Sequence, residues 1–92
     1  MPRIEWDERK DRENRRRHGV AFSEAATVLR DPLAITIEDP EHSGVEHREV
    51  TIGWSGDARL LVVVHTAGDT VLRIISARMA TSHERRTYEE RA

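Results

Sequence analysis

Cysteine is absent from the 92 residues, and aromatic side chains are scarce. Without a thiol, the chain has no disulfide, no thiolate zinc site and no cysteine nucleophile. Only two Trp, one Tyr and one Phe are present, so the core must be built mainly from Val, Ile, Leu and Ala. We therefore expect one small domain that spans residues 1–92 and has no large buried substrate cavity.

Long hydrophobic runs are also missing. The longest apolar run, from Leu60 to Val64, covers five residues, whereas a membrane-spanning helix needs about 20. The first residues, from Met1 to Asp7, contain no apolar segment of the kind that a secretory signal peptide requires. We therefore expect a soluble, cytoplasmic protein that makes no contact with a membrane.

A large excess of charge of either sign is missing as well. The net charge is −2, which argues against a protein that coats nucleic acid non-specifically. Residues 1–20 and 58–92 are net basic, whereas 21–57 are net acidic. Every basic residue except Lys10 is an arginine, which suits bidentate recognition of phosphate or carboxylate but also arises in a GC-rich genome. Any phosphate site must therefore be local.

The first predicted element is a helix over residues 8–18, with Asp7 as N-cap and Gly19 after its last turn. It has an acidic first turn and a basic last turn, which suits the helix dipole. Because it contains no aliphatic residue, most of its charges are interpreted as a solvated face. Helical spacing places Lys10, Asn14 and His18 along one side.

The remaining pattern predicts an α+β fold. A second helix is expected to start with Ser23 as N-cap and to end before Asp31-Pro32, and a third over 84–91 follows a capping box from Thr81 to Glu84. Strands are expected at residues 33–37, 48–54, 59–66 and 71–76. An acidic, turn-rich loop at 39–44 is the best candidate for disorder. The expected architecture is two N-terminal helices packed on a roughly four-stranded antiparallel sheet, with a C-terminal helix.

The motifs of several enzyme classes are not found. Five histidines are present, but His83-Glu84 lacks the second histidine of a zincin helix, and His42 and His47 have no partner in register. The sequence also has no glycine-rich phosphate loop and no Gly-x-Ser-x-Gly elbow. We therefore expect neither a metal nor a cofactor.

Arginines on the predicted strands are the strongest chemical signal. Arg48 shares a strand face with Val50 and Ile52, so it either extends from the rim of the core or points into a groove. Arg73 lies between apolar neighbours, where a charge needs a partner or a ligand. The direction of Arg78 depends on where its strand ends, so alternation alone does not place it beside Arg73.

These residues belong to a longer pattern that resembles the BrnT family of type II toxins. The pattern covers nearly the whole chain and consists of Ile4-Glu-Trp-Asp7, Lys10, Asn14, His18-Gly-Val20, Phe22, Glu24-Ala25, Asp31-Pro32, Arg48, Ile52-Gly53, Leu60-Leu-Val-Val-Val64, Arg73-Ile-Ile-Ser-Ala-Arg78, Ala80, Glu84-Arg85 and Tyr88. The start, Trp-Asp-x-x-Lys-x-x-x-Asn-x-x-x-His-Gly-Val, is specific when it is joined to Ile-Ser-Ala-Arg.

The resemblance implies a RelE-like fold and a metal-independent endoribonuclease that arrests growth. It also implies a BrnA-like antitoxin partner with a ribbon-helix-helix DNA-binding region. Two toxins would bind one antitoxin dimer, and this chain itself would make no DNA contact. A different class of function, a non-catalytic protein-binding module that keeps only the antitoxin-binding surface, remains the alternative.

The resemblance also implies the site. RNA cleavage without a metal requires a deprotonated 2′-OH, a stabilised phosphorane charge and a neutralised leaving oxygen. Arginines suit the second role, so Arg48, Arg73 and Arg78 are expected to clamp the phosphate. The other expected residues are Lys10, Glu84 and Tyr88 as catalytic groups, with His18 and Asn14 as substrate contacts. Each general-base candidate has a structural alternative: Glu84 as a capping residue, Tyr88 as a packing residue and His18 as a helix C-terminal cation.

Overall fold

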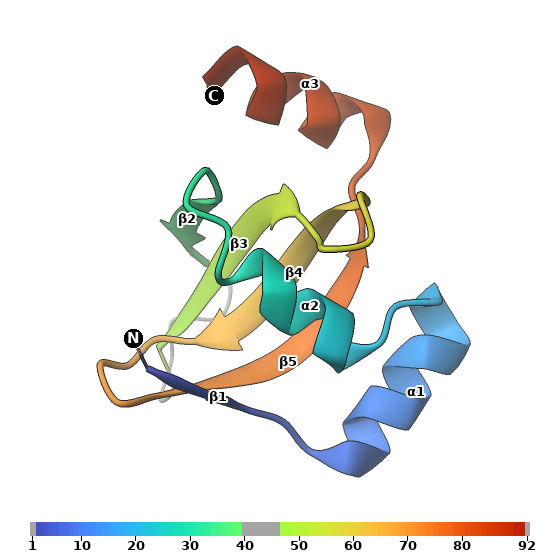
Figure 1. Ribbon diagram of the computed structural model, residues 1–92, viewed down its shortest axis with the longest axis vertical. Coiled ribbons are helices and arrows are strands. Elements are labelled where there is room, and N and C mark those ends of the chain that lie inside the picture. Colours follow the sequence, from blue (N-terminus) through green and yellow to red (C-terminus); the bar gives the residue numbers. More distant parts are fainter. Residues whose placement is uncertain (1, 40–46, 92) are drawn as a thin grey trace.

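The computed structural model describes residues 2–39 and 47–91 (Figure 1). These residues form, in chain order, β1 (Arg3–Glu5), α1 (Glu8–His18), α2 (Phe22–Val28), β2 (Ile35–Glu38), β3 (Arg48–Trp54), β4 (Leu60–Thr66), β5 (Val71–Met79) and α3 (Ser82–Arg91). The α+β class and the helix over residues 8–18 are therefore confirmed. Most of the predicted acidic loop, residues 40–44, lies outside the described residues.

The sheet differs from the prediction in size and in strand direction. It has five strands in the order β1-β5-β4-β3-β2, and β1 pairs with β5 in parallel. The four strands β2 to β5 form the antiparallel part. The expectation of a roughly four-stranded antiparallel sheet was wrong because β1 has only three residues, too few for an alternating pattern, and its partner lies far away in the sequence.

The start of α2 also differs from the prediction. Ala21, and not Ser23, occupies the N-cap position, and no side chain of its own caps the helix. Instead, the carboxylate of Asp11 in α1 accepts a hydrogen bond of 2.8 Å from the backbone N–H of Phe22. A residue of another helix thus supplies the acceptor that a local cap would otherwise provide.

The bounds of three other elements differ from the prediction. β2 begins at Ile35 and not at residue 33, because Leu33 lies in a turn where its N–H donates to the Asp31 carboxylate. β5 continues to Met79, beyond the predicted end at residue 76, and carries an irregularity opposite Val64 and His65. The capping box of α3 is confirmed by reciprocal hydrogen bonds between Thr81 and Glu84, 2.9 and 3.1 Å long, although the helix begins at Ser82.

The hydrophobic core lies between one face of the sheet and the helices α1 and α2 (Figure 1). Its largest fully buried side chains are those of Phe22, Leu61, Ile74, Val20, Val28 and Val63. Trp6 packs its ring edge-on against Phe22, with centroids 6.5 Å apart. Gly53 of β3 allows Ala34 and Val28 to approach the sheet closely, since a Cβ there would lie 2.9 Å from the Cβ of Ala34. The aromatic residues that flank α1 thus anchor a helix that has no aliphatic face of its own.

Candidate functional site

Three polar side chains form a row across the face of the sheet opposite α1 and α2. Arg48 of β3 lies directly opposite Thr66 of β4, and the backbone N–H of Arg73 in β5 donates to the Thr66 hydroxyl over 3.0 Å. The next pair along these strands, His65 and Ile74, is buried on the core side. Since alternate residues point to opposite faces, Arg48, Thr66 and Arg73 share the other face. We call them the arginine row.

Arg78 lies on the same face but outside the arginine row. It is opposite Val62, four residues along β4 from Thr66, or about 13 Å at strand spacing. Its guanidinium makes two parallel hydrogen bonds with the carboxylate of Glu84 in α3, 2.7 and 2.8 Å long. The predicted clamp is therefore divided into two parts on one face.

The pair between Arg78 and Glu84 changes the acidity of both groups. The hydrogen bonds from Arg78 lower the pKa of Glu84 to about 2, with a further contribution from the backbone N–H of Thr81. The same pair raises the pKa of Arg78. The Glu84 carboxylate therefore accepts hydrogen bonds from the Thr81 N–H at the start of α3 and from Arg78 at the same time.

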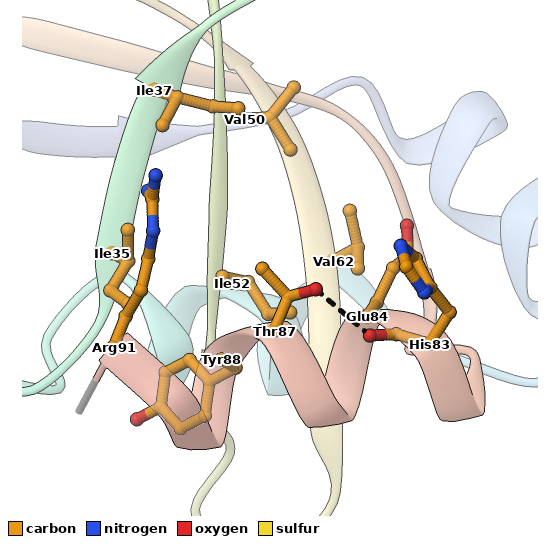
Figure 2. A pocket seen from close by; sticks show the side chains of 10 residues that line it. All are labelled: Ile35, Ile37, Val50, Ile52, Val62, His83, Glu84, Thr87, Tyr88 and Arg91. Carbon is orange, nitrogen blue, oxygen red and sulfur yellow. Dashed lines mark hydrogen bonds between the residues drawn. The ribbon is translucent and has the colours of Figure 1, made fainter.

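An open groove, which we call the α3 groove, separates α3 from the sheet (Figure 2). Its volume is about 270 Å³, and it is lined by Ile35, Ile37, Val50, Ile52, Val62, His83, Glu84, Thr87, Tyr88 and Arg91. The five aliphatic residues come from β2, β3 and β4 and form its floor. Tyr88 is only 4% exposed, and its hydroxyl donates to the carbonyl of Leu33 over 3.3 Å. Burial raises the pKa of its phenol.

The predicted site residues of α1 lie elsewhere. Lys10 and His18 line a separate groove with Arg17 and with Ser76 of β5. The structure therefore does not bring them together with the α3 groove or with the arginine row.

Asn14, the third predicted residue of α1, is 7% exposed. Its amide N–H₂ donates to the carbonyls of Val20 and Ala77, both over 2.8 Å, and its amide oxygen accepts from the N–H of Ala77 over 3.1 Å. These three backbone contacts occupy the side chain, so its observed role is to join α1 to β5.

Sequence reasoning missed Thr66 and Arg91. The regular alternation of β4 signals the outward direction of Thr66, but only the register shows that two arginines flank it. Within residues 2–39 and 47–91, no three His, Cys, Asp or Glu side chains are grouped as metal ligands. His65, for example, is buried, and its ring nitrogens contact the Thr51 hydroxyl and the Thr66 carbonyl.

The comparisons with known proteins place this chain in the class of ribonuclease toxins. The family model described as "Ribonuclease toxin, BrnT, of type II toxin-antitoxin system" matches residues 6–84, and the chain belongs to this family. Among solved structures, the chain is similar to the ribonuclease toxin BrnT of Brucella abortus. The TM-score is 0.68 at 25% sequence identity, and the match covers 89% of this chain and 100% of that one.

A search of curated proteins gave no match. The family confirms the resemblance drawn from the sequence, and a toxin of a type II system has an antitoxin as its partner. None of the helices within the described residues is long and apolar enough to cross a membrane.

Proposed function

We propose that this chain is a metal-independent endoribonuclease of the RelE type, and that RNA cleavage by it arrests growth. The observation that carries the proposal is the arginine row, which puts Arg48 and Arg73 on the two sides of Thr66 on an open sheet face. Family membership supports the reaction class. The guanidinium groups of the row are suited to binding phosphate oxygens.

The spacing of the arginine row suits a single phosphodiester. Arg48 and Arg73 stand two strands apart, about 10 Å between their Cα atoms, so two long side chains can converge on one phosphate above Thr66. Each guanidinium can donate two parallel hydrogen bonds to phosphate oxygens. Donors fixed in this way stabilise the additional negative charge of the phosphorane more than that of the ground state.

Arg78, Glu84 and Tyr88 are proposed for roles at the other end of the face. Arg78 would hold a second phosphate of the same RNA strand. With a pKa of about 2, Glu84 is a weak base at neutral pH, so we assign it to positioning Arg78. The hydroxyl of the buried Tyr88 already donates to the Leu33 carbonyl, so we assign Tyr88 to positioning α3 and not to accepting the 2′-OH proton.

Lys10 and His18 are proposed as contacts to RNA beyond the scissile bond. Their groove is also lined by Arg17 and Glu13, and cations such as Lys10 and Arg17 bind the backbone of a strand without reading its sequence. Asn14 would act only through the position of α1. Replacing Lys10 should therefore weaken RNA binding and reduce its dependence on salt, with little change in the rate at saturating RNA.

The proposed partner is a BrnA-like antitoxin with a ribbon-helix-helix region, with two toxins for each antitoxin dimer. The antitoxin would make the DNA contact, and the complex would act in the cytoplasm. Family membership supports the existence of the antitoxin. A specific shift of operator DNA by this chain alone would contradict the proposed division of roles.

The test of the reaction is incubation of the purified chain with RNA in excess EDTA. Cleavage should continue, and Arg48→Met and Arg73→Met should each reduce the rate on the order of 10²–10³-fold. Arg9→Met is the control, because Arg9 is exposed on α1; it should cleave like the wild type, and expression of either active protein should arrest growth. Full activity of a folded Arg48→Met/Arg73→Met double variant, or loss of wild-type cleavage in EDTA, would contradict the proposal.

A second candidate function is a non-catalytic protein-binding module. It is favoured by one observation, that the guanidinium of Arg78 is already bound by Glu84. RNA that stays intact under all conditions, together with normal antitoxin binding, would support this alternative.

A further inference from the structure

The floor of the α3 groove is an apolar surface that α3 covers only in part. Ile37 is 53% exposed, and Leu33, in the turn that precedes β2, is 69% exposed. They are two of the three large hydrophobic residues that are exposed among the described residues. Ile37 lines the groove together with four other aliphatic residues, and a partly exposed aliphatic floor of this kind marks a contact surface and not an ordinary solvated face.

The charges around this groove are mainly positive. Figure 2 shows the Arg91 side chain extending past Ile35 toward Ile37, so its guanidinium lies above the apolar floor. Arg48 lies two residues from Val50 on the same strand face. Among the described residues that line the groove, the one carboxylate is that of Glu84, which is bound by Arg78. An acidic occupant would therefore meet cations on two sides.

The nature of the floor favours a polypeptide over RNA. Ile35, Ile37, Val50, Ile52 and Val62 are aliphatic, whereas bases are usually held by aromatic rings or guanidinium planes on which they stack. The ring of Tyr88 is 4% exposed, so it offers little stacking surface. Aliphatic side chains of a partner, in contrast, fill such a groove with the full gain of apolar burial.

We propose that the α3 groove binds an acidic amphipathic segment of the antitoxin. The segment places aliphatic side chains against Ile37, Val50 and Ile52, and its carboxylates pair with Arg91 and Arg48. This inference rests on the proposed function in one respect, since the partner is the antitoxin of the same system. Because the floor continues directly to the arginine row, the bound segment also covers Arg48 and keeps RNA from reaching it.

The experiment measures the affinity of the purified chain for the antitoxin encoded beside it, by isothermal titration calorimetry. Ile37→Glu places a carboxylate on the groove floor, where it loses apolar contact and repels an acidic segment. Ile37 is already half-exposed, so the variant should fold, and it should bind the antitoxin roughly 100-fold more weakly. Its cleavage of RNA without antitoxin should be unchanged.

Met79→Glu is the matched control. Met79 is a comparably exposed apolar residue, 44% exposed, but it lies opposite the buried Leu61 and therefore on the other face of the sheet. This variant should bind the antitoxin like the wild type. Arg91→Glu should weaken binding about tenfold, and the weakening should diminish as salt is added.

Two results would overturn the inference. The first is an unchanged affinity of Ile37→Glu for the antitoxin, and the second is an equal loss for Met79→Glu. If the affinity of Ile37→Glu is unchanged and its RNA cleavage is reduced, the groove is assigned to RNA. Failure of the proposed reaction is distinguishable, because an inactive wild-type chain can still show the expected pattern of antitoxin affinities.

Discussion

The two faces of the sheet are built from similar strands but differ in how they are covered. On the face toward α1 and α2, the side chains of Phe22, Leu61 and Val63 are completely buried. On the opposite face, Val50 and Ile52 are only half-buried, and α3 leaves a groove of about 270 Å³ above them. The first face is closed, and the second is open.

The polar groups follow the same division. On the closed face, Asn14 and Asp11 are buried, and both make hydrogen bonds with backbone groups of other elements. On the open face, the arginines stand at the rim of an apolar floor. The comparison indicates that the closed face supplies stability, whereas the open face keeps charge and apolar surface available for binding.

The largest effect on the closed face should come from Asn14→Ala. The substitution leaves Val20 and Ala77 with three buried backbone groups that have lost their partner, which should cost about 4 kcal/mol of unfolding free energy. Urea denaturation measures the change. The neighbouring Glu13→Ala is the control and should change stability by less than about 0.5 kcal/mol; an equally small change for Asn14→Ala would mean that α1 is not held by this amide.

Replacing a valine by alanine on each face compares how tightly the two faces are packed. Val63→Ala removes methyl groups from a completely buried site and should cost about 2.5 kcal/mol, whereas Val50→Ala at a half-buried site should cost about 1 kcal/mol. Thermal and denaturant unfolding of the two variants give the difference. Equal losses would show that the open face is packed as firmly as the closed one.

A smaller effect is expected where α3 is attached to the open face. The pKa of Glu84 is lowered from 4.5 to about 2 by Arg78, so its carboxylate stabilises the folded state above pH 4.5. This contribution is lost as the pH falls from 4.5 to about 2. Because the Arg78 side chain is 42% exposed, solvent screening reduces the contribution to about 1–2 kcal/mol.

Glu84→Gln measures this contribution. It should lower stability at neutral pH by about 1–2 kcal/mol, and the difference from the wild type should disappear near the lower end of the titration. Glu89→Gln, at an exposed position of the same helix, provides the control. A difference between Glu84→Gln and the wild type that does not depend on pH would exclude the carboxylate as its source.

The smallest effect on stability is expected at Arg48. Arg48→Met keeps a side chain of similar length and removes the cost of desolvating a charge, so the thermal midpoint should stay constant or rise slightly. Differential scanning calorimetry tests this, and the cleavage assay of the same sample reports its function. A clearly lower midpoint would indicate that Arg48 stabilises the open face in addition to any role toward RNA.

The local elements were largely predictable, whereas contacts between distant segments were not. Asp7 and Gly19 mark the ends of α1 by local chemistry, since the Asp7 carboxylate accepts from the first backbone N–H groups and Gly19 adopts a φ of 70°. The start of α2 escaped prediction because its cap comes from Asp11 in another helix. β1 escaped because a strand of three residues depends on pairing with β5.

The candidate site shows the same limit. Alternation along β3 predicts the direction of Arg48, but the grouping of Arg48, Thr66 and Arg73 depends on the register of three strands. The irregularity in β5 next to His65 shifts the alternation, and this is why Arg73 and Arg78 share a face although five positions separate them. No local sequence pattern predicts such a register shift.

The sequence by itself determined the α+β class, the ends of α1 and the capping box of α3, because these depend on residues close together in the chain. It also determined the BrnT family, because the motif is a pattern of residue types that can be read without the fold. Only the tertiary structure decided that Asn14 joins α1 to β5, that Glu84 binds Arg78, and that a groove lies beneath α3. Each of these depends on how strands and helices far apart in sequence are placed in space, which propensity and periodicity do not encode.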